Sequence, residues 1–226
     1  MIDKFVPDID AALDGIGDGA TIMIGGFGAV GQPHALVDAL AERGLRGLTI
    51  IANNAGADFG GLPKLMERGA IRKVVCSYPR ATPGANKATF ENLYTAGKIE
   101  LELVPQGTLA ERIRAAGAGI PAFFTPTGAG TKLAEGKETR MVNGRLCVLE
   151  HALFAEFALI EAWEADRWGN LTYRRVGRNF NQPMASAATV TIALAHRRRE
   201  LGEIDPDAVV TPGLFVNRVV IAEDAA

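Results

Sequence analysis

Short apolar runs alternate with stretches of helical periodicity through the first half of the chain. The apolar runs predict strands at residues 21–24, 48–52, 73–76 and 99–104. The helical stretches between them predict helices at residues 33–43, 62–68, 88–97 and 109–116. The first helix is expected to start at Pro33, since proline suits the first turn. Alternation of this kind predicts a mostly parallel sheet with helices on both of its faces.

The second half of the chain is richer in strand signals. Residues 138–142 and 145–149 flank Asn143 and Gly144, a pair that favours a hairpin with a type I′ turn. Further strands are predicted at residues 157–163, 170–174, 189–195 and 217–223. The basic run at 196–199 is followed by Glu200 and Glu203, and we interpret it as a solvated helix face, with an inter-subunit contact as the alternative. The pattern predicts a single α/β domain over residues 1–226, with a mixed, mostly parallel sheet and a hairpin-rich second half.

A glycine-rich loop separates the first predicted strand from the first predicted helix. Glycine permits positive φ and lets the backbone approach a ligand closely, and the following helix N-terminus favours anionic groups. The sequence therefore predicts a seat for a phosphate or thioester group; the alternative is a tight turn without a ligand. The residues of this candidate site are Gly25, Gly26, Phe27, Gly28, Ala29, Val30 and Gly31.

The same loop satisfies the spacing G-x-G-x-x-G from Gly26 to Gly31. Dinucleotide-binding folds also place an acidic residue at the end of the second strand, where it holds the ribose. Asn53 and Asn54 occupy that place here. An NAD-dependent oxidoreductase is therefore the lesser hypothesis.

Polar amides follow two of the predicted strands. Asn53 and Asn54 come after the second strand, and Gln106 comes after the fourth. Because ligands of α/β sheets bind at the carboxyl ends of strands, Asn53 and Gln106 are candidate substrate-binding residues. The alternative is local turn capping by the same side chains.

Composition narrows the function classes. The 226 residues are 48% hydrophobic and 22% charged, with a net charge of −2, so no general attraction to nucleic acid or anionic membranes is expected. The longest apolar run, residues 157–163, contains Glu161 and is far shorter than the roughly 20 residues of a membrane-spanning helix. With no apolar signal core at the start, a cytoplasmic location is expected.

Cys76 and Cys147 are expected to be free, buried thiols, without the spacing of a metal site.

The stretch from Asp18 to Pro33 resembles the signature of one of the two subunit types, the A type, of the family I coenzyme A-transferases. That signature consists of an apolar run, then Gly-Gly-Phe, then a glycine after a short gap, and a proline after a further gap. The resemblance extends over the chain in ordered blocks. They are residues 51–56, 73–77, 104–112, 124–128, 136–140, 165–174, 178–181 and 211–213. The chain departs from the family after Leu194, where acidic residues are more usual than this basic run.

The resemblance implies an enzyme that moves coenzyme A from succinyl-CoA to a 3-oxoacid through an enzyme-glutamyl thioester. Residues 166–174 are most similar to members that act on 3-oxoadipate, with acetoacetate enzymes as close relatives. In this family the nucleophilic glutamate lies in a Ser-Glu-Asn-Gly-like motif of the B-type subunit, and this sequence contains no such motif. The expected partner is therefore a CoA-transferase subunit of the B type, with acyl-CoA and 3-oxoacid as substrates, no permanent cofactor and no catalytic residue in this chain. A non-enzymatic CoA-binding or scaffold protein is the remaining alternative.

Overall fold

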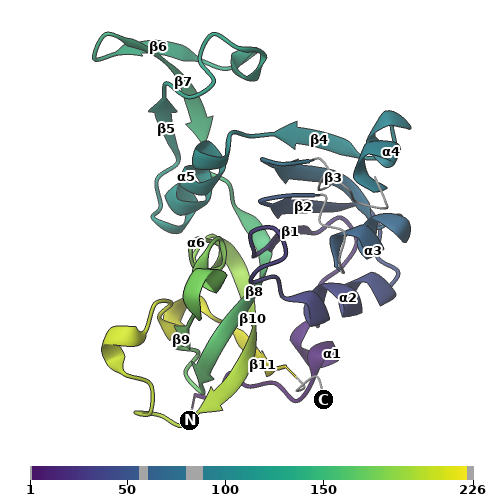
Figure 1. The fold of residues 1–226 in the computed structure, drawn as a ribbon, viewed down its shortest axis with the longest axis vertical. Coiled ribbons are helices and arrows are strands. Elements are labelled where there is room, and N and C mark those ends of the chain that lie inside the picture. The colour runs from purple at the N-terminus through teal and green to yellow at the C-terminus, as the bar shows by residue number, and fades with distance from the viewer. Residues whose placement is uncertain (1, 56–60, 80–88, 223–226) are drawn as a thin grey trace.

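The computed structural model describes residues 2–55, 61–79 and 89–222 (Figure 1). Parallel strands form the main sheet in the order β11-β10-β8-β1-β2-β3-β4, and the short β9 pairs antiparallel with β8. The strands are β1 (Thr21–Ile24), β2 (Leu48–Ala52), β3 (Ile71–Cys76), β4 (Glu100–Leu103), β8 (Ala155–Asp166), β9 (Leu171–Thr172), β10 (Ala188–Arg199) and β11 (Arg218–Ile221). The mixed, mostly parallel sheet is as predicted.

Helices cover both faces of the sheet and enclose two apolar clusters. The first face carries α1 (Ile9–Ala12), α2 (His34–Glu42), α3 (Leu62–Glu67) and α4 (Thr89–Thr95), which pack on alternate strand residues such as Ile22, Ile50 and Val74. The opposite face carries α5 (Gln106–Gly117) and α6 (Asn181–Ala185), which pack on residues such as Met23 and Ile51. Burial on both sides explains why these strands are apolar runs rather than alternating patterns.

A small antiparallel sheet stands apart from the main sheet, at the top of Figure 1. Its order is β5-β7-β6, with β5 (Ala122–Thr125), β6 (Thr139–Val142) and β7 (Arg145–His151). Asn143 and Gly144 have φ of 49° and 75°, which confirms the type I′ turn predicted between β6 and β7. Short 3-10 helices complete the described chain: η1 (Lys132–Ala134), η2 (Arg175–Arg178), η3 (Pro206–Ala208) and η4 (Gly213–Phe215).

The interpretation of residues 196–199 as a helix face is wrong. These residues are the last part of β10, which runs parallel to β8 until Arg199 lies opposite Asp166. The Arg199 guanidinium pairs with the Glu164 carboxylate on β8. Polar pairs between neighbouring strands therefore extend β10 past its apolar residues, and the local sequence does not reveal such pairs.

The chain reverses its direction of strand addition at β1. From β1 it adds strands toward β4, and it then returns to the other side of β1 to place β8, β10 and β11. Ligands of open α/β sheets bind outside the carboxyl ends of the strands at such a point. The glycine loop follows β1 directly and so lies at this position.

Residues 56, 88 and 223, which the predicted elements and blocks included, lie outside the described residues.

Candidate functional site

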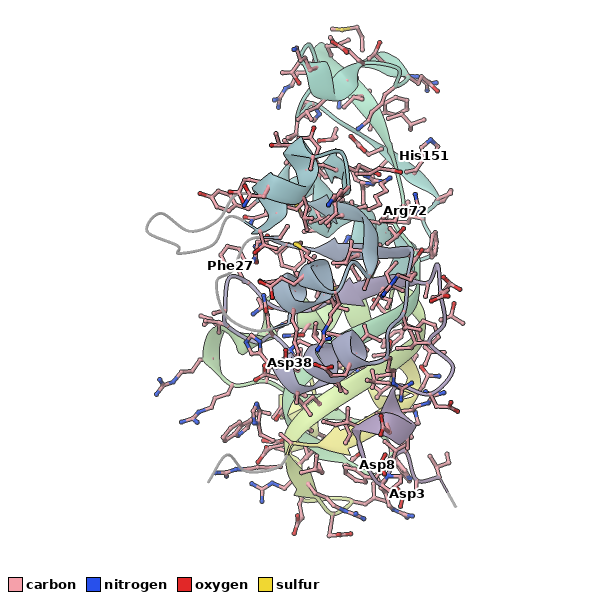
Figure 2. All side chains as sticks on the ribbon, turned by 90° about the vertical axis from the view of Figure 1, so that its right-hand side faces the viewer. Asp3, Asp8, Phe27, Asp38, Arg72 and His151 are labelled. Atoms are coloured by element: carbon pink, nitrogen blue, oxygen red, sulfur yellow. The ribbon has the colours of Figure 1, made fainter. Side chains whose placement is uncertain are left out.

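The glycine loop closes into a tight turn at its tip. The Phe27 amide donates to the Val30 carbonyl over 2.9 Å, and the Val30 amide donates back to the Phe27 carbonyl over 3.1 Å. Gly28 lies inside this turn with a φ of 59°, which favours glycine. The turn leaves the Phe27 side chain 50% exposed. In Figure 2, Phe27 projects on the side of the molecule opposite Arg72, which lies near the start of β3.

Glycines at the base of the loop allow close approach of other elements. A Cβ on Gly25 would lie 1.8 Å from Oδ1 of Asn181, and a Cβ on Gly26 would lie 2.4 Å from Cγ of Gln32. Gly31 has a φ of 71° and faces the backbone oxygen of Gly177. The glycines are therefore required by packing inside this chain, whether or not a ligand also contacts them.

Asn181 is the buried centre of the contacts that hold the loop. The residue is 0% exposed, and its Nδ2 donates to the carbonyls of Gly31 and Gly177, each over 2.8 Å. Its Oδ1 accepts from the Glu161 amide on β8 over 3.0 Å. Asn179 donates to the Val30 carbonyl over 3.0 Å. Neither asparagine was predicted to be a site residue, although residues 178–181 form one of the blocks of resemblance.

Most loop amides already donate inside the chain. Gly25 donates to the Leu159 carbonyl over 2.9 Å, and Gly28 donates to Oδ1 of Asn54 over 3.1 Å. With Phe27 and Val30 engaged in the turn, these four N–H groups are not free to cradle a ligand in this conformation. The cofactor-binding role predicted for the loop stays a prediction, and the large side chains that the loop leaves exposed are those of Phe27 and Val30.

The structure brings Asn53 and Gln106 together. Gln106 begins α5, just after β4, and its Nε2 donates to Oδ1 of Asn53 at the end of β2 over 2.6 Å. Asn53 is 4% exposed, whereas Gln106 is exposed. The neighbouring Asn54 holds the glycine loop through the bond to Gly28. Polar groups from the ends of β1, β2 and β4 thus meet at one edge of the sheet.

Two buried hydroxyl groups lie near the same edge. Ser77 follows β3, which lies between β2 and β4, and its amide donates to the Asn53 carbonyl over 3.1 Å. Thr108 lies in the first turn of α5. Within the described residues, Oγ of Ser77 and Oγ1 of Thr108 make no hydrogen bond. Buried polar groups are usually paired, so both hydroxyls are potential donors to a ligand at this edge. Neither was singled out from the sequence, because nothing local distinguishes them from ordinary turn and helix residues.

Other kinds of site find less support. Both cysteines are free and buried, as predicted, and burial raises the pKa of the Cys76 thiol to about 12. Among the described residues, no group of three or more metal-ligating side chains comes together, and no helix has the length and apolar character needed to cross a membrane.

Residues 6–222 match the protein family described as Coenzyme A transferase. The chain is 57% identical to the A subunit of 3-oxoadipate CoA-transferase from Pseudomonas putida, over all of this chain and 96% of that protein. It is 53% identical to the A subunit of succinyl-CoA:3-ketoacid coenzyme A transferase from Xanthomonas campestris, over 96% of this chain and 88% of that protein.

Solved structures share the fold. Glutaconate coenzyme A-transferase from Acidaminococcus fermentans matches with a TM-score of 0.85 and 23% identity, over 97% of this chain and 75% of that one. This likeness confirms the mixed α/β architecture.

Proposed function

The chain belongs to the coenzyme A transferase family, and we propose that it is the A-type half of a heteromeric 3-oxoacid CoA-transferase. In this proposal it moves coenzyme A from succinyl-CoA to 3-oxoadipate, together with a separate partner subunit of the B type. The observation that carries the proposal is the contact between Gln106 and Asn53 beside the glycine loop, in a chain of this family. A cytoplasmic location belongs to the same proposal and agrees with two free thiols.

The reaction proceeds through two acyl exchanges on a glutamate of the partner. The glutamate carboxylate attacks the thioester carbonyl of succinyl-CoA and releases the CoA thiolate, which leaves a mixed anhydride. The thiolate attacks the glutamyl carbonyl of that anhydride, so succinate departs and a glutamyl-CoA thioester remains. The carboxylate of 3-oxoadipate then attacks the glutamyl thioester and releases the CoA thiolate, which leaves a second anhydride. The thiolate attacks the 3-oxoadipyl carbonyl of this anhydride, so 3-oxoadipyl-CoA departs and the glutamate is restored. Dividing one exchange into covalent steps is the general advantage of nucleophilic catalysis.

Gln106 and Asn53 supply hydrogen-bond donors in this scheme. A side-chain amide nitrogen carries two hydrogens, and Gln106 gives one of them to Oδ1 of Asn53. That bond fixes the orientation of the amide and leaves the second hydrogen for an oxygen of the substrate. A donor held in place before the reaction stabilises the negative charge that develops on a tetrahedral intermediate.

The nucleophile is assigned to a second chain because this sequence contains no Ser-Glu-Asn-Gly motif. The relatives from Pseudomonas putida and Xanthomonas campestris are each named as one subunit of their enzyme, which is consistent with a partner. The glycine loop and the Gln106 amide then form one wall of a site that only the partner completes. No cofactor is held permanently, and the coenzyme A thioester is a substrate.

Acetoacetate is the second candidate acceptor, because relatives named for 3-ketoacids are nearly as similar as those named for 3-oxoadipate. An assay with this chain, its purified partner, succinyl-CoA and each acid in turn tests the proposal. We expect transfer to both acids with a larger kcat/KM for 3-oxoadipate, and no transfer by either chain alone. A larger kcat/KM for acetoacetate would move the assignment to the second candidate, and absence of any transfer would leave a CoA-binding or scaffold protein.

The dinucleotide hypothesis finds no structural support at the end of β2. Asn53 and Asn54 stand where a ribose-binding acid is needed, and both side-chain oxygens are already engaged by Gln106 and Gly28. Titration of the chain with NADH is expected to give no binding at micromolar concentrations.

A further inference from the structure

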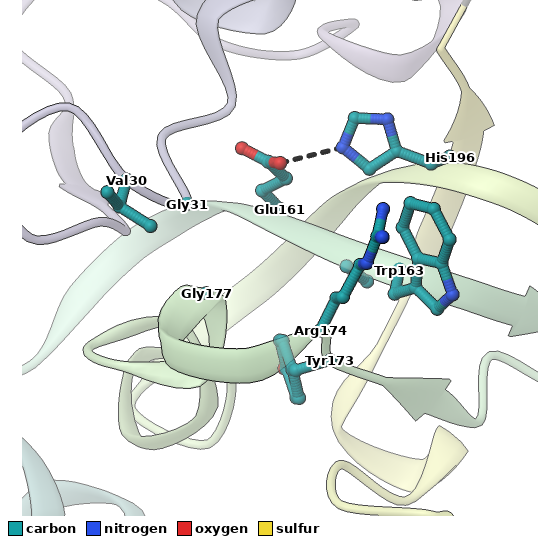
Figure 3. A pocket seen from close by; sticks show the side chains of 9 residues that line it. Val30, Gly31, Glu161, Trp163, Tyr173, Arg174, Gly177 and His196 are labelled. Carbon is teal, nitrogen blue, oxygen red and sulfur yellow. Dashed lines mark hydrogen bonds and ion pairs between the residues drawn. The ribbon is translucent and has the colours of Figure 1, made fainter.

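A cavity of about 250 Å³ lies beside the glycine loop, on the side away from Asn53 and Gln106. Val30 and Gly31 of the loop form one wall, and Glu161 and Trp163 of β8 form another. His196 of β10 and Arg174, which follows β9, add polar groups to the lining (Figure 3). The cavity shares Val30 and Gly31 with the glycine loop, whereas Asn53 and Gln106 are not among the described residues that line it.

Two arginines lie against the indole ring of Trp163. The guanidinium carbons of Arg174 and Arg197 each lie 4.6 Å from the ring centroid, at a distance typical of cation–π contacts. Within residues 2–55, 61–79 and 89–222, neither guanidinium makes a hydrogen bond or an ion pair. The ring therefore holds two positive groups in place while their N–H donors remain available.

Among the described residues that line this cavity, Glu161 carries the one carboxylate, and that carboxylate already has a partner. Oε1 of Glu161 lies 2.7 Å from Nε2 of His196, and Figure 3 shows this contact beside the Arg174 side chain. The Glu161 carboxylate therefore does not neutralise Arg174 or Arg197 through an ion pair. In a chain with a net charge of −2, Arg174 in the lining and Arg197 on the same indole ring thus place two cationic groups with N–H donors beside this cavity.

Exposed apolar side chains continue this surface toward the glycine loop. Nδ2 of Asn179 donates to the carbonyls of both Val30 and Val176, each over 3.0 Å, so these two residues lie side by side. Their exposed fractions are 48% and 72%. Arginine, tryptophan and apolar side chains in one patch are the usual composition of the centre of a protein interface. We define the Trp163 surface as Val30, Trp163, Arg174, Val176, His196 and Arg197.

We propose that the Trp163 surface binds the partner subunit, with one of the partner's carboxylate side chains entering the cavity between Arg174 and His196. This inference rests on the proposed function, which requires a partner to cover the glycine loop that borders the cavity. The volume of the cavity agrees with this occupant. About 250 Å³ is enough for one side chain but is below the roughly 300–1,000 Å³ of pockets that enclose whole small-molecule ligands. A carboxylate would gain charge-assisted hydrogen bonds from the guanidinium groups.

The test measures the dissociation constant of the heteromeric complex for the charge reversals Arg174→Glu and Arg197→Glu. The matched control is Arg145→Glu, which makes the same charge change on an exposed residue at the start of β7. We expect each reversal at the Trp163 surface to weaken the complex at least about tenfold, since like charges across an interface are repulsive. The control is expected to change the constant less than about twofold. Circular dichroism and urea unfolding of each variant establish that it folds.

Activity measurements at saturating partner concentration separate binding from catalysis. The kcat of the reversal variants is expected to return to within about twofold of the wild-type value, because these arginines serve association. Unchanged dissociation constants in the folded variants would overturn the inference. So would an unchanged dissociation constant with a raised KM for succinyl-CoA, which would assign the arginines to the phosphates of coenzyme A. If the wild-type chain itself neither binds the partner nor transfers coenzyme A with it, the proposed function fails first.

Discussion

The side-chain amide of Gln106 donates a hydrogen bond to Oδ1 of Asn53 over 2.6 Å and joins the ends of β4 and β2 across β3. The two residues are 53 positions apart in sequence. Because Asn53 is buried at its strand end, it can orient the exposed glutamine without moving itself. The pair therefore sets the direction in which Gln106 presents its second N–H group.

The first prediction concerns this pair. Gln106→Ala removes the donor proposed for the developing oxyanion, so kcat in the presence of the partner should fall about 10²–10³-fold. Asn53→Ala should lower kcat less, because the glutamine remains but loses its orientation. Since the two residues act together, the increase in activation free energy in the double variant should be smaller than the sum of the increases in the two single variants. Gln182→Ala, in α6, is the matched control, and a similar loss of kcat there would contradict the assignment.

A second prediction concerns the packing of the glycine loop. Gly25→Ala places a Cβ 1.8 Å from Oδ1 of Asn181, so the asparagine must move and give up hydrogen bonds to the loop. We expect the free energy of unfolding to fall by about 1–3 kcal/mol in urea titrations. Gly17→Ala is the control, since no atom lies within 4 Å of its added Cβ. Equal stability of the two variants would show that Asn181 does not hold the loop.

The third prediction concerns the Glu102 carboxylate, which accepts from Lys73 over 2.6 Å and from Arg112 over 2.9 Å. Burial raises the pKa of Glu102, but the hydrogen bonds and charges of these two partners outweigh it and hold the pKa below its usual range. A carboxyl with a lower pKa in the folded state stabilises the fold above its unfolded pKa of about 4.3, and this stabilisation is lost as the pH falls through the folded value.

Urea unfolding across this acidic range should therefore show a steeper loss of stability in wild type than in Glu102→Gln. Glu100→Gln, which removes an exposed carboxylate 3.5 Å from Arg72, is the control and should keep the wild-type slope. The same slope in wild type and Glu102→Gln would show that Glu102 does not contribute to the acid sensitivity of the fold.

A fourth prediction follows from the burial of Cys76. With a pKa of about 12 and no exposed surface, this thiol is neither ionised nor accessible at about pH 8. In a Cys147→Ser variant, Cys76 should react with a disulfide reagent only when the protein is unfolded in denaturant. Rapid, stoichiometric modification of the folded variant would contradict the packing around β3.

Local sequence predicted much of the first half of the fold, because its strands and helices alternate and are separated by glycine and proline residues. Asn53 and Gln106 could be named because the carboxyl ends of parallel strands gather at one edge of a sheet. The direct bond between them could not be predicted, since it depends on where tertiary packing places the start of α5 relative to the end of β2. The conformation of Asn143 and Gly144 followed from the turn chemistry alone.

Features that depend on distant parts of the chain escaped prediction. Asn181 bonds to Gly31 from 150 positions away, and nothing near the loop indicates that its glycines accommodate this side chain. The basic end of β10 lacks the alternation of a half-buried strand, because Arg199 pairs with Glu164 of β8 instead of packing in the core. In both cases tertiary contacts decided the local structure.

The most direct test of the central claim is to locate the covalent intermediate. The heteromeric complex is incubated with succinyl-CoA, treated with borohydride to reduce a glutamyl thioester, and both chains are mapped by mass spectrometry. We predict one modified glutamate, on the partner, and none on this chain. A reduced glutamate in this chain, or turnover by this chain without a partner, would contradict the claim.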